Sequence, residues 1–176
     1  PVQYVGEWTL KNGEHVVVRP IRPEDEPLMV HFHETLSDRT VYLRYLQLLK
    51  LSQRVAHERL TRICFIDYNR ELALVAERQD PATGQPEIIG VGRLQRIHGT
   101  RDAEFAIVIS DQFQHQGLGH ELLRRLLEVA RDFGIQTVRA DILADNVAMQ
   151  RICEKFGFLI KRDLNQPTLE AELHLA

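Results

Sequence analysis

The sequence is short of cysteine and has no long apolar run. Its two cysteines, Cys64 and Cys153, lie far apart and form no Cys-x-x-Cys pair, which argues against a disulfide framework and a cysteine-rich zinc site. No apolar run approaches the roughly 18 residues of a membrane-spanning helix, and no signal peptide opens the chain. We therefore expect a protein of the reducing cytoplasm that holds no metal and does not enter a membrane.

An excess of basic residues is also missing. The chain has 22 Lys and Arg against 25 Asp and Glu, a formal net charge of -3, so its composition does not favour binding to nucleic acid or to an anionic membrane. The 44% of hydrophobic and 27% of charged residues are typical of a globular protein, and 176 residues suit one domain with a sizeable core. Because the first residue is Pro1 rather than Met, we expect residues 1–176 to be one domain of a longer chain.

Hydrophobic periodicity predicts an order of strands and helices that suits a mixed sheet. Segments with the length and apolar pattern of strands are 16–21, 71–78, 87–98, 104–109, 137–143, 158–162 and 168–175. Helices are predicted after the Pro-containing acidic segment 22–27 and over 39–49, 52–63, 118–133 and 147–156. Hairpins pair strands antiparallel, whereas crossovers through a helix pair them parallel. We therefore expect an α+β fold with a mixed, largely antiparallel central sheet of about seven strands flanked by helices.

Residues 114–119, Gln-His-Gln-Gly-Leu-Gly, are the most informative stretch of the chain. They lie between the predicted strand 104–109 and an amphipathic helix that starts at Leu118. The first N–H groups of a helix have no partner within it, and the helix dipole adds partial positive charge there. Gly117 and Gly119 have no Cβ, so an anion can approach their backbone closely. The pattern predicts a phosphate site, with a plain tight turn as the alternative, and it matches neither a Walker A loop nor a dinucleotide fingerprint.

The order of these motifs resembles the GNAT superfamily of acyl-CoA-dependent N-acyltransferases. The resemblance covers Glu104 on its strand, the loop Gln114-x-x-Gly117-x-Gly119, Asn146 at the start of the next helix, and Gly157-Phe158. Segments 19–26 and 65–76 resemble more narrowly the bacterial protein lysine acetyltransferases of the Pat type. Those enzymes commonly carry the GNAT domain at one end of a chain whose larger part resembles an ADP-forming acyl-CoA synthetase. The resemblance implies an acetyl-CoA-dependent lysine acetyltransferase with acyl-CoA synthetases as protein substrates.

The resemblance also implies where acetyl-CoA binds. In the family the diphosphate lies on backbone amides of the loop, here Gln114, His115, Gln116, Gly117, Leu118, Gly119 and His120. The pantetheine arm is expected along the preceding strand, on main-chain groups of Ile107, Val108 and Ile109, because that strand diverges from its neighbour. A main-chain N–H of Ile107 or Ile109 is expected to hold the thioester oxygen as it gains charge. Asn146 resembles the family residue that contacts the arm, and capping of its helix is an equally good role.

Glu104 is the candidate general base. A lysine amine with a pKa near 10.4 is neutral in only about one molecule in 2,500 at pH 7, and only the neutral form attacks a thioester. As general base, the Glu104 carboxylate would lie beside the acyl group and take the proton directly or through water. The alternative is that Glu104 has no catalytic role and faces solvent from an edge strand. Where many family members have a tyrosine that protonates the departing thiolate, this chain has Cys153, either a thiol acid or a buried structural residue. Two other functions remain open: a non-catalytic acyl-CoA sensor and an acetyltransferase for small amines.

Overall fold

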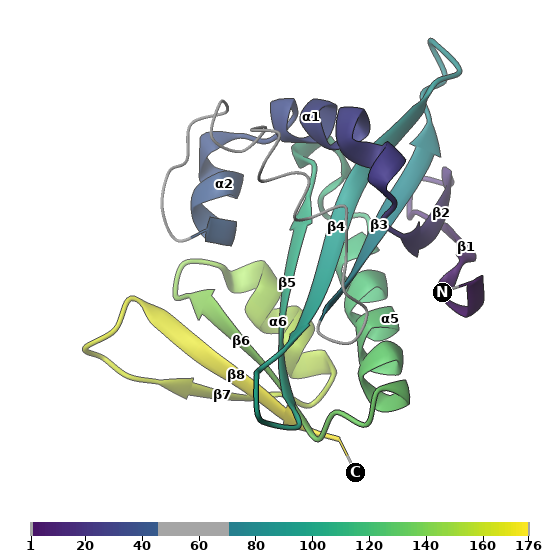
Figure 1. The fold of residues 1–176 in the computed structure, drawn as a ribbon. Coiled ribbons are helices and arrows are strands. Elements are labelled where there is room, and N and C mark those ends of the chain that lie inside the picture. Colours follow the sequence, from purple (N-terminus) through teal and green to yellow (C-terminus); the bar gives the residue numbers. More distant parts are fainter. Residues whose placement is uncertain (1, 46–70, 176) are drawn as a thin grey trace.

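The computed structural model describes residues 2–45 and 71–175, which form one central sheet with helices on both faces (Figure 1). The eight strands have the order β1-β2-β3-β4-β5-β6-β8-β7, and every neighbouring pair is antiparallel except β5 and β6. Their bounds are β1 Gly6–Thr9, β2 His15–Pro20, β3 Glu71–Gln79, β4 Pro86–Arg96, β5 Asp102–Ile109, β6 Thr137–Leu143, β7 Leu159–Arg162 and β8 Thr168–His174. The expected α+β fold with a mixed, largely antiparallel sheet is confirmed.

One strand was not predicted. The edge strand β1 adds an eighth member to a sheet for which about seven were expected. Its four residues alternate between half-buried and exposed because successive side chains point to opposite faces of the sheet. None of the four is fully buried, and so short a segment lacks a clear apolar pattern. The predicted helix 52–63, the end of the predicted helix 39–49, and Cys64 lie outside the described residues.

The sheet divides the hydrophobic core into two clusters, and helices cover the cluster on each face. On one face lie α1 (Glu26–Glu34), entered through the 3-10 turn η2 (Pro23–Asp25), and α2 (Asp38–Tyr45). There Phe32 and Met29 pack on apolar side chains of β3, β4 and β5. The other face is covered by α5 (Leu118–Asp132) and α6 (Val147–Lys155), with two short 3-10 turns, η1 (Val2–Tyr4) and η3 (Asp111–Phe113), completing the described elements.

The length and apolar pattern of α5 follow from its position on the sheet. Its buried side chains recur at i, i+4 and i+8, and Leu118, Leu122 and Leu126 are each at most 1% exposed. Strands β3 and β4 are buried over most of their length because helices cover both of their faces. Within residues 2–45 and 71–175, no helix combines the length and the apolar character needed to cross a membrane.

The sheet opens between β5 and β6. Strand β5 pairs with β4 from Ala103 to Ile109, but it pairs with β6 only from Asp102 to Glu104. Beyond Glu104 the two parallel strands diverge, as Figure 1 shows. The predicted divergence of this strand from its neighbour is therefore confirmed, and the helix that follows β5 starts at the same end of the gap.

Candidate active site

The gap between β5 and β6 holds a pocket of about 270 Å³. Its walls come from the two diverging strands β5 and β6, from the start of α6 and from one residue of α2. They are Leu43, Glu104, Phe105, Ala106, Ile107, Ala140, Asp141, Ile142, Asn146 and Met149. The lining is apolar except for two carboxylates and one amide, which suits an uncharged acyl chain that has a polar reacting group at one end.

The main chain of β5 offers hydrogen-bonding groups to this gap at alternate residues. In the antiparallel ladder with β4, Ser110 N donates to Ile89 O at 2.9 Å, and alternate residues back along β5 repeat this pattern. The N–H and C=O of Val108 therefore face β4, whereas those of Ile107 and Ile109 face the gap. The expected main-chain contact from Val108 is not supported by this register. Ile107 and Ile109 remain the candidates for the pantetheine arm.

Glu104 lies on the pocket wall at the point where the strands part. Its exposed side chain projects from the same face of β5 as Val108, the face that α1 covers further along the strand. The neighbouring cation is Arg139 on β6, but its guanidinium is already bound by Asp102 at 3.3 Å and Glu170 at 3.2 Å. Among the described residues Glu104 has no salt bridge, so its carboxylate is available to a proton donor that enters the pocket.

A second carboxylate, Asp141, lines the same pocket and was not singled out from the sequence. It is exposed and belongs to β6, two residues beyond Arg139 on the same face of the strand. The alternation of side chains in the segment 137–143 was the available signal, because it groups Asp141 with Arg139. That β6 and Glu104 share one pocket was not visible without the sheet order.

The loop before α5 has the backbone conformation that the glycine pattern predicted. His115 and Gly117 have positive φ angles of 62° and 85°, and Gly117 is the N-cap residue of α5 in the left-handed region. No side chain caps this helix end, and the first intrahelical bond from the start of the helix runs from Glu121 N to Gly117 O at 3.1 Å. The N–H groups of residues 118–120 are therefore the orphan donors that an anion can satisfy.

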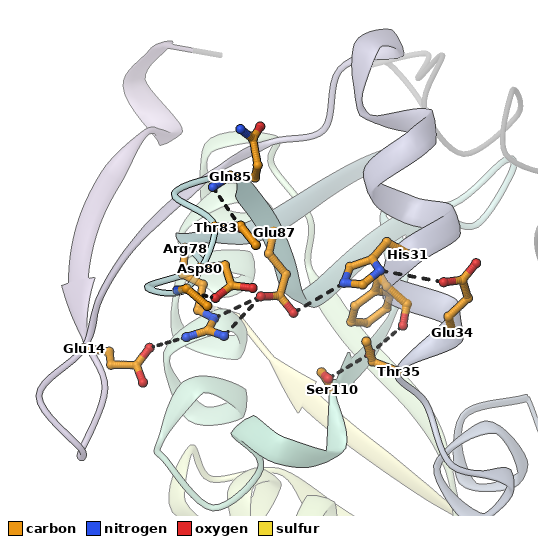
Figure 2. A network of polar contacts seen from close by, with 12 residues as sticks. Glu14, His31, Glu34, Thr35, Arg78, Asp80, Thr83, Gln85, Glu87 and Ser110 are labelled. Atoms are coloured by element: carbon orange, nitrogen blue, oxygen red, sulfur yellow. Dashed lines mark hydrogen bonds and ion pairs between the residues drawn. The ribbon is translucent and has the colours of Figure 1, made fainter.

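The side chain of Gln114 has a structural task in this loop. Its amide Nε2 donates to the carbonyl of Ile109 and to Oγ1 of Thr40, both at 3.1 Å, and so ties the loop to the end of β5 and to α2. Figure 2 shows a second tie, where Ser110 donates to Thr35 at the end of α1 at 2.8 Å. The loop is thus held against the helices of the opposite face. The main-chain N–H of Gln114 donates to Asp111 O at 3.4 Å, so neither this N–H nor the side-chain amide is left over for an anion.

The first turn of α5 packs closely against α6. A Cβ added to Gly119 would lie 3.2 Å from Cδ1 of Ile152, so a larger residue would require the Ile152 side chain to shift by a few tenths of an ångström. One residue further on, the ring of His120 stacks on Phe156 with centroids 4.4 Å apart and planes inclined by 27°. These contacts hold the start of α5 beside the gap and direct the His120 side chain toward α6.

Asn146 and Cys153 belong to the same helix but differ in access to the pocket. The Oδ1 atom of Asn146 accepts a hydrogen bond from Met149 N at 3.2 Å, which confirms the capping role, and Asn146 also lines the pocket. Cys153 is 0% exposed and does not line the pocket, and burial together with the charge of Glu154 raises the pKa of its thiol to about 12. Of the two roles considered for Cys153, the structure favours the buried structural one.

Comparisons of sequence agree with this geometry. The family model of the acetyltransferase (GNAT) domain matches residues 15–159. An acetyltransferase of Pseudomonas aeruginosa is 31% identical over 160 residues, which are 91% of this chain and 83% of that protein. The acetyltransferase Pat of Mycolicibacterium smegmatis is 27% identical over 165 residues, 93% of this chain, and the chain spans about half of its length, 47%.

Solved structures show the same architecture. The GNAT domain of S. lividans PAT has a TM-score of 0.86 and 27% identity over 99% of both chains. The PaiA N-acetyltransferase of Thermoplasma acidophilum, solved in complex with coenzyme A, has a TM-score of 0.66 and 16% identity, covers 91% of this chain and 99% of its own, and shares the fold. A pocket at diverging strands, an uncapped helix start beside it and a family match over most of the chain lead to one conclusion: the chain belongs to the GNAT acetyltransferase family.

Proposed function

We propose that this domain transfers an acetyl group from acetyl-CoA to the Nε amine of a lysine on a protein, by direct attack and with Glu104 as general base. The observation that carries the proposal is that Glu104 and Ile107 line a single pocket, and that the uncapped start of α5 packs against α6, the helix whose first turn lines the same pocket. The orphan N–H groups of residues 118–120 fit a diphosphate, and the apolar walls fit an acyl chain.

Acetyl-CoA supplies an activated acyl group, and residues of this chain supply the rest of the chemistry. Glu104 accepts one proton from the lysine ammonium, which leaves a neutral amine able to attack a carbonyl carbon. The N–H of Ile107 faces the gap and donates to the carbonyl oxygen as that oxygen gains negative charge. The bond from nitrogen to the acyl carbon forms and the carbon–sulfur bond breaks. The nitrogen gives up its second proton to the departing thiolate, so the products are a neutral amide and a free thiol, with no acid from Cys153.

The nature of the acceptor is inferred from charge and from similarity. Glu104 and Asp141 both line the pocket, neither has a salt bridge among the described residues, and carboxylates favour the approach of a cationic lysine side chain. Similarity to proteins named Pat supports a protein lysine as the acceptor, and acyl-CoA synthetases are the protein substrates that the resemblance to Pat-type enzymes implies.

The test is a transfer assay with acetyl-CoA and purified acyl-CoA synthetase. The rate of free thiol release gives the turnover, and mass spectrometry locates the acetylated lysines. We expect Glu104→Gln to lower kcat by about 10²- to 10⁴-fold and to leave coenzyme A affinity nearly unchanged. Glu128→Gln is the matched control, since Glu128 is an exposed carboxylate on α5 away from the pocket. Unchanged turnover in Glu104→Gln removes Glu104 from the mechanism. Binding of coenzyme A by the wild type without thiol release contradicts transfer to the synthetase, and repeating the assay with small amines separates an acetyltransferase for small amines from a sensor.

A further inference from the structure

The hairpin between β1 and β2 lies against the loop that precedes α5. Lys11 N donates to Gln116 O at 3.2 Å, although the two residues are far apart in the sequence. A Cβ added to Gly117 would lie 3.2 Å from Cη2 of Trp8 and 3.6 Å from Cε of Lys11. The ammonium of Lys11 is one bond beyond Cε, so its charge lies beside the N-cap residue of α5.

Side chains from the body of the domain hold this hairpin in place. Figure 2 shows Arg78 between Glu14 at the base of β2 and Glu87 on β4, with contacts of 2.9 and 3.1 Å. The Arg78 guanidinium also lies 4.4 Å from the ring centroid of Phe113 in η3, directly before the loop. The hairpin is therefore fastened to the segment that leads into the anion site.

A second fastening lies on the other strand of the hairpin. The Arg125 guanidinium donates from Nη2 to Glu7 O at 3.3 Å, and its Nε binds Glu121 at 2.7 Å. Arg125 belongs to α5, so β1 is joined to the helix whose start forms the site. Because both strands are fastened, the position of Lys11 relative to Gly117 is a property of the fold and not of one flexible side chain alone.

The ammonium of Lys11 forms no salt bridge within the part of the chain that the structure describes. Lys11 is exposed and takes part in no salt bridge there, whereas Lys161 lies 3.7 Å from Glu172. The acid in the first turn of α5, Glu121, is already bound by Arg124 and Arg125. A free cation next to the positive end of a helix dipole is unfavourable until an anion binds there.

We propose that Lys11 is a cofactor-binding residue whose ammonium contacts a phosphate oxygen of the diphosphate of coenzyme A. This inference rests on the proposed function, in that the start of α5 binds the cofactor. The diphosphate is favoured over the 3′-phosphate because Lys11 lies beside Gly117, the residue at which the orphan N–H groups of α5 begin. The β1–β2 hairpin thus adds a charged contact to a site otherwise built from neutral backbone amides.

Calorimetric titration with coenzyme A and with 3′-dephospho-coenzyme A tests this assignment. We expect Lys11→Ala to weaken binding of both ligands by about three- to tenfold, with the difference shrinking at high salt. Lys11→Arg is expected to retain affinity. Lys155→Ala, at an exposed lysine near the end of α6, is the matched control and is expected to bind as the wild type does.

Each other result has a distinct meaning. Wild-type affinity in Lys11→Ala, with the wild type itself binding coenzyme A, overturns the role of Lys11 and leaves the proposed function intact. A loss seen with coenzyme A but not with 3′-dephospho-coenzyme A overturns the assignment to the diphosphate. Absence of binding by the folded wild type contradicts the proposed function itself. Thermal unfolding of every variant shows that an exposed lysine was removed without loss of the fold.

Discussion

The substitution Gly117→Ala separates the backbone requirement of the loop from its packing. Gly117 has φ 85° and ψ 0°, where a Cβ costs about 1–2 kcal/mol relative to glycine. The added methyl would also lie 3.2 Å from Cη2 of Trp8, closer than ordinary van der Waals contact, so the ring or the loop must shift by a few tenths of an ångström. This overpacking adds about 1 kcal/mol or more to the backbone cost.

The same helix offers a matched control. Gly134, which follows α5, has φ 71°, and no described atom lies within 4 Å of a Cβ added there. Gly134→Ala therefore meets the backbone cost alone, and we expect it to lower the free energy of unfolding by about 1–2 kcal/mol. For Gly117→Ala we expect a loss of about 2–4 kcal/mol, because the contact with Trp8 is added.

Urea denaturation and calorimetric titration with coenzyme A measure the two effects. We expect Gly134→Ala to bind coenzyme A as the wild type does, and Gly117→Ala to bind at least about tenfold more weakly, because a shift of the loop moves the N–H groups of residues 118–120. Equal losses of stability in the two variants would refute the tight contact with Trp8. Equal affinities would refute the start of α5 as the diphosphate site.

Three further predictions concern the buried charges and the buried thiol. Asp25→Ala removes the contacts of 2.7 and 2.8 Å from the buried Arg19 and leaves it the ion pair with Glu77 at 3.1 Å. We therefore expect a loss of about 3 kcal/mol in urea denaturation, the lower end of the range for breaking a buried ion pair. Burial acts to raise the pKa of Glu121, but hydrogen bonds and charges from two arginines lower it below 4.5. Its stabilising effect is therefore present above pH 4.5 and lost as the pH falls through the lowered pKa, so wild type and Glu121→Gln should converge in stability in acid. Cys153, with its pKa raised to about 12, should resist iodoacetamide at pH 8 in the folded protein, as mapped by mass spectrometry, and Cys153→Ala should keep its turnover.

Local sequence was sufficient for the central unit of the fold. Strand β5, the loop and α5 follow one another directly, so the apolar periods and the glycines predict each element and its junction. The helix cap at Asn146 was predictable for the same reason, since an Asn side chain and the N–H three residues later belong to one turn. Glu104 was assigned as base by resemblance, and its place in the mechanism stays a prediction.

Contacts between distant segments required the assembled sheet. The direction of each main-chain group of β5 depends on its register with β4, which removes Val108 from the gap and leaves Ile107 facing it. Asp141 shares a pocket with Glu104 because β5 and β6 are paired at one end only. The β1–β2 hairpin, with Lys11 in its turn, meets the loop from the N-terminal end of the chain. Hydrophobic periodicity reports only on residues that are close together in the sequence. Strand register and strand order decide which backbone groups remain unpaired and which charged side chains meet. Both depend on how the whole domain packs.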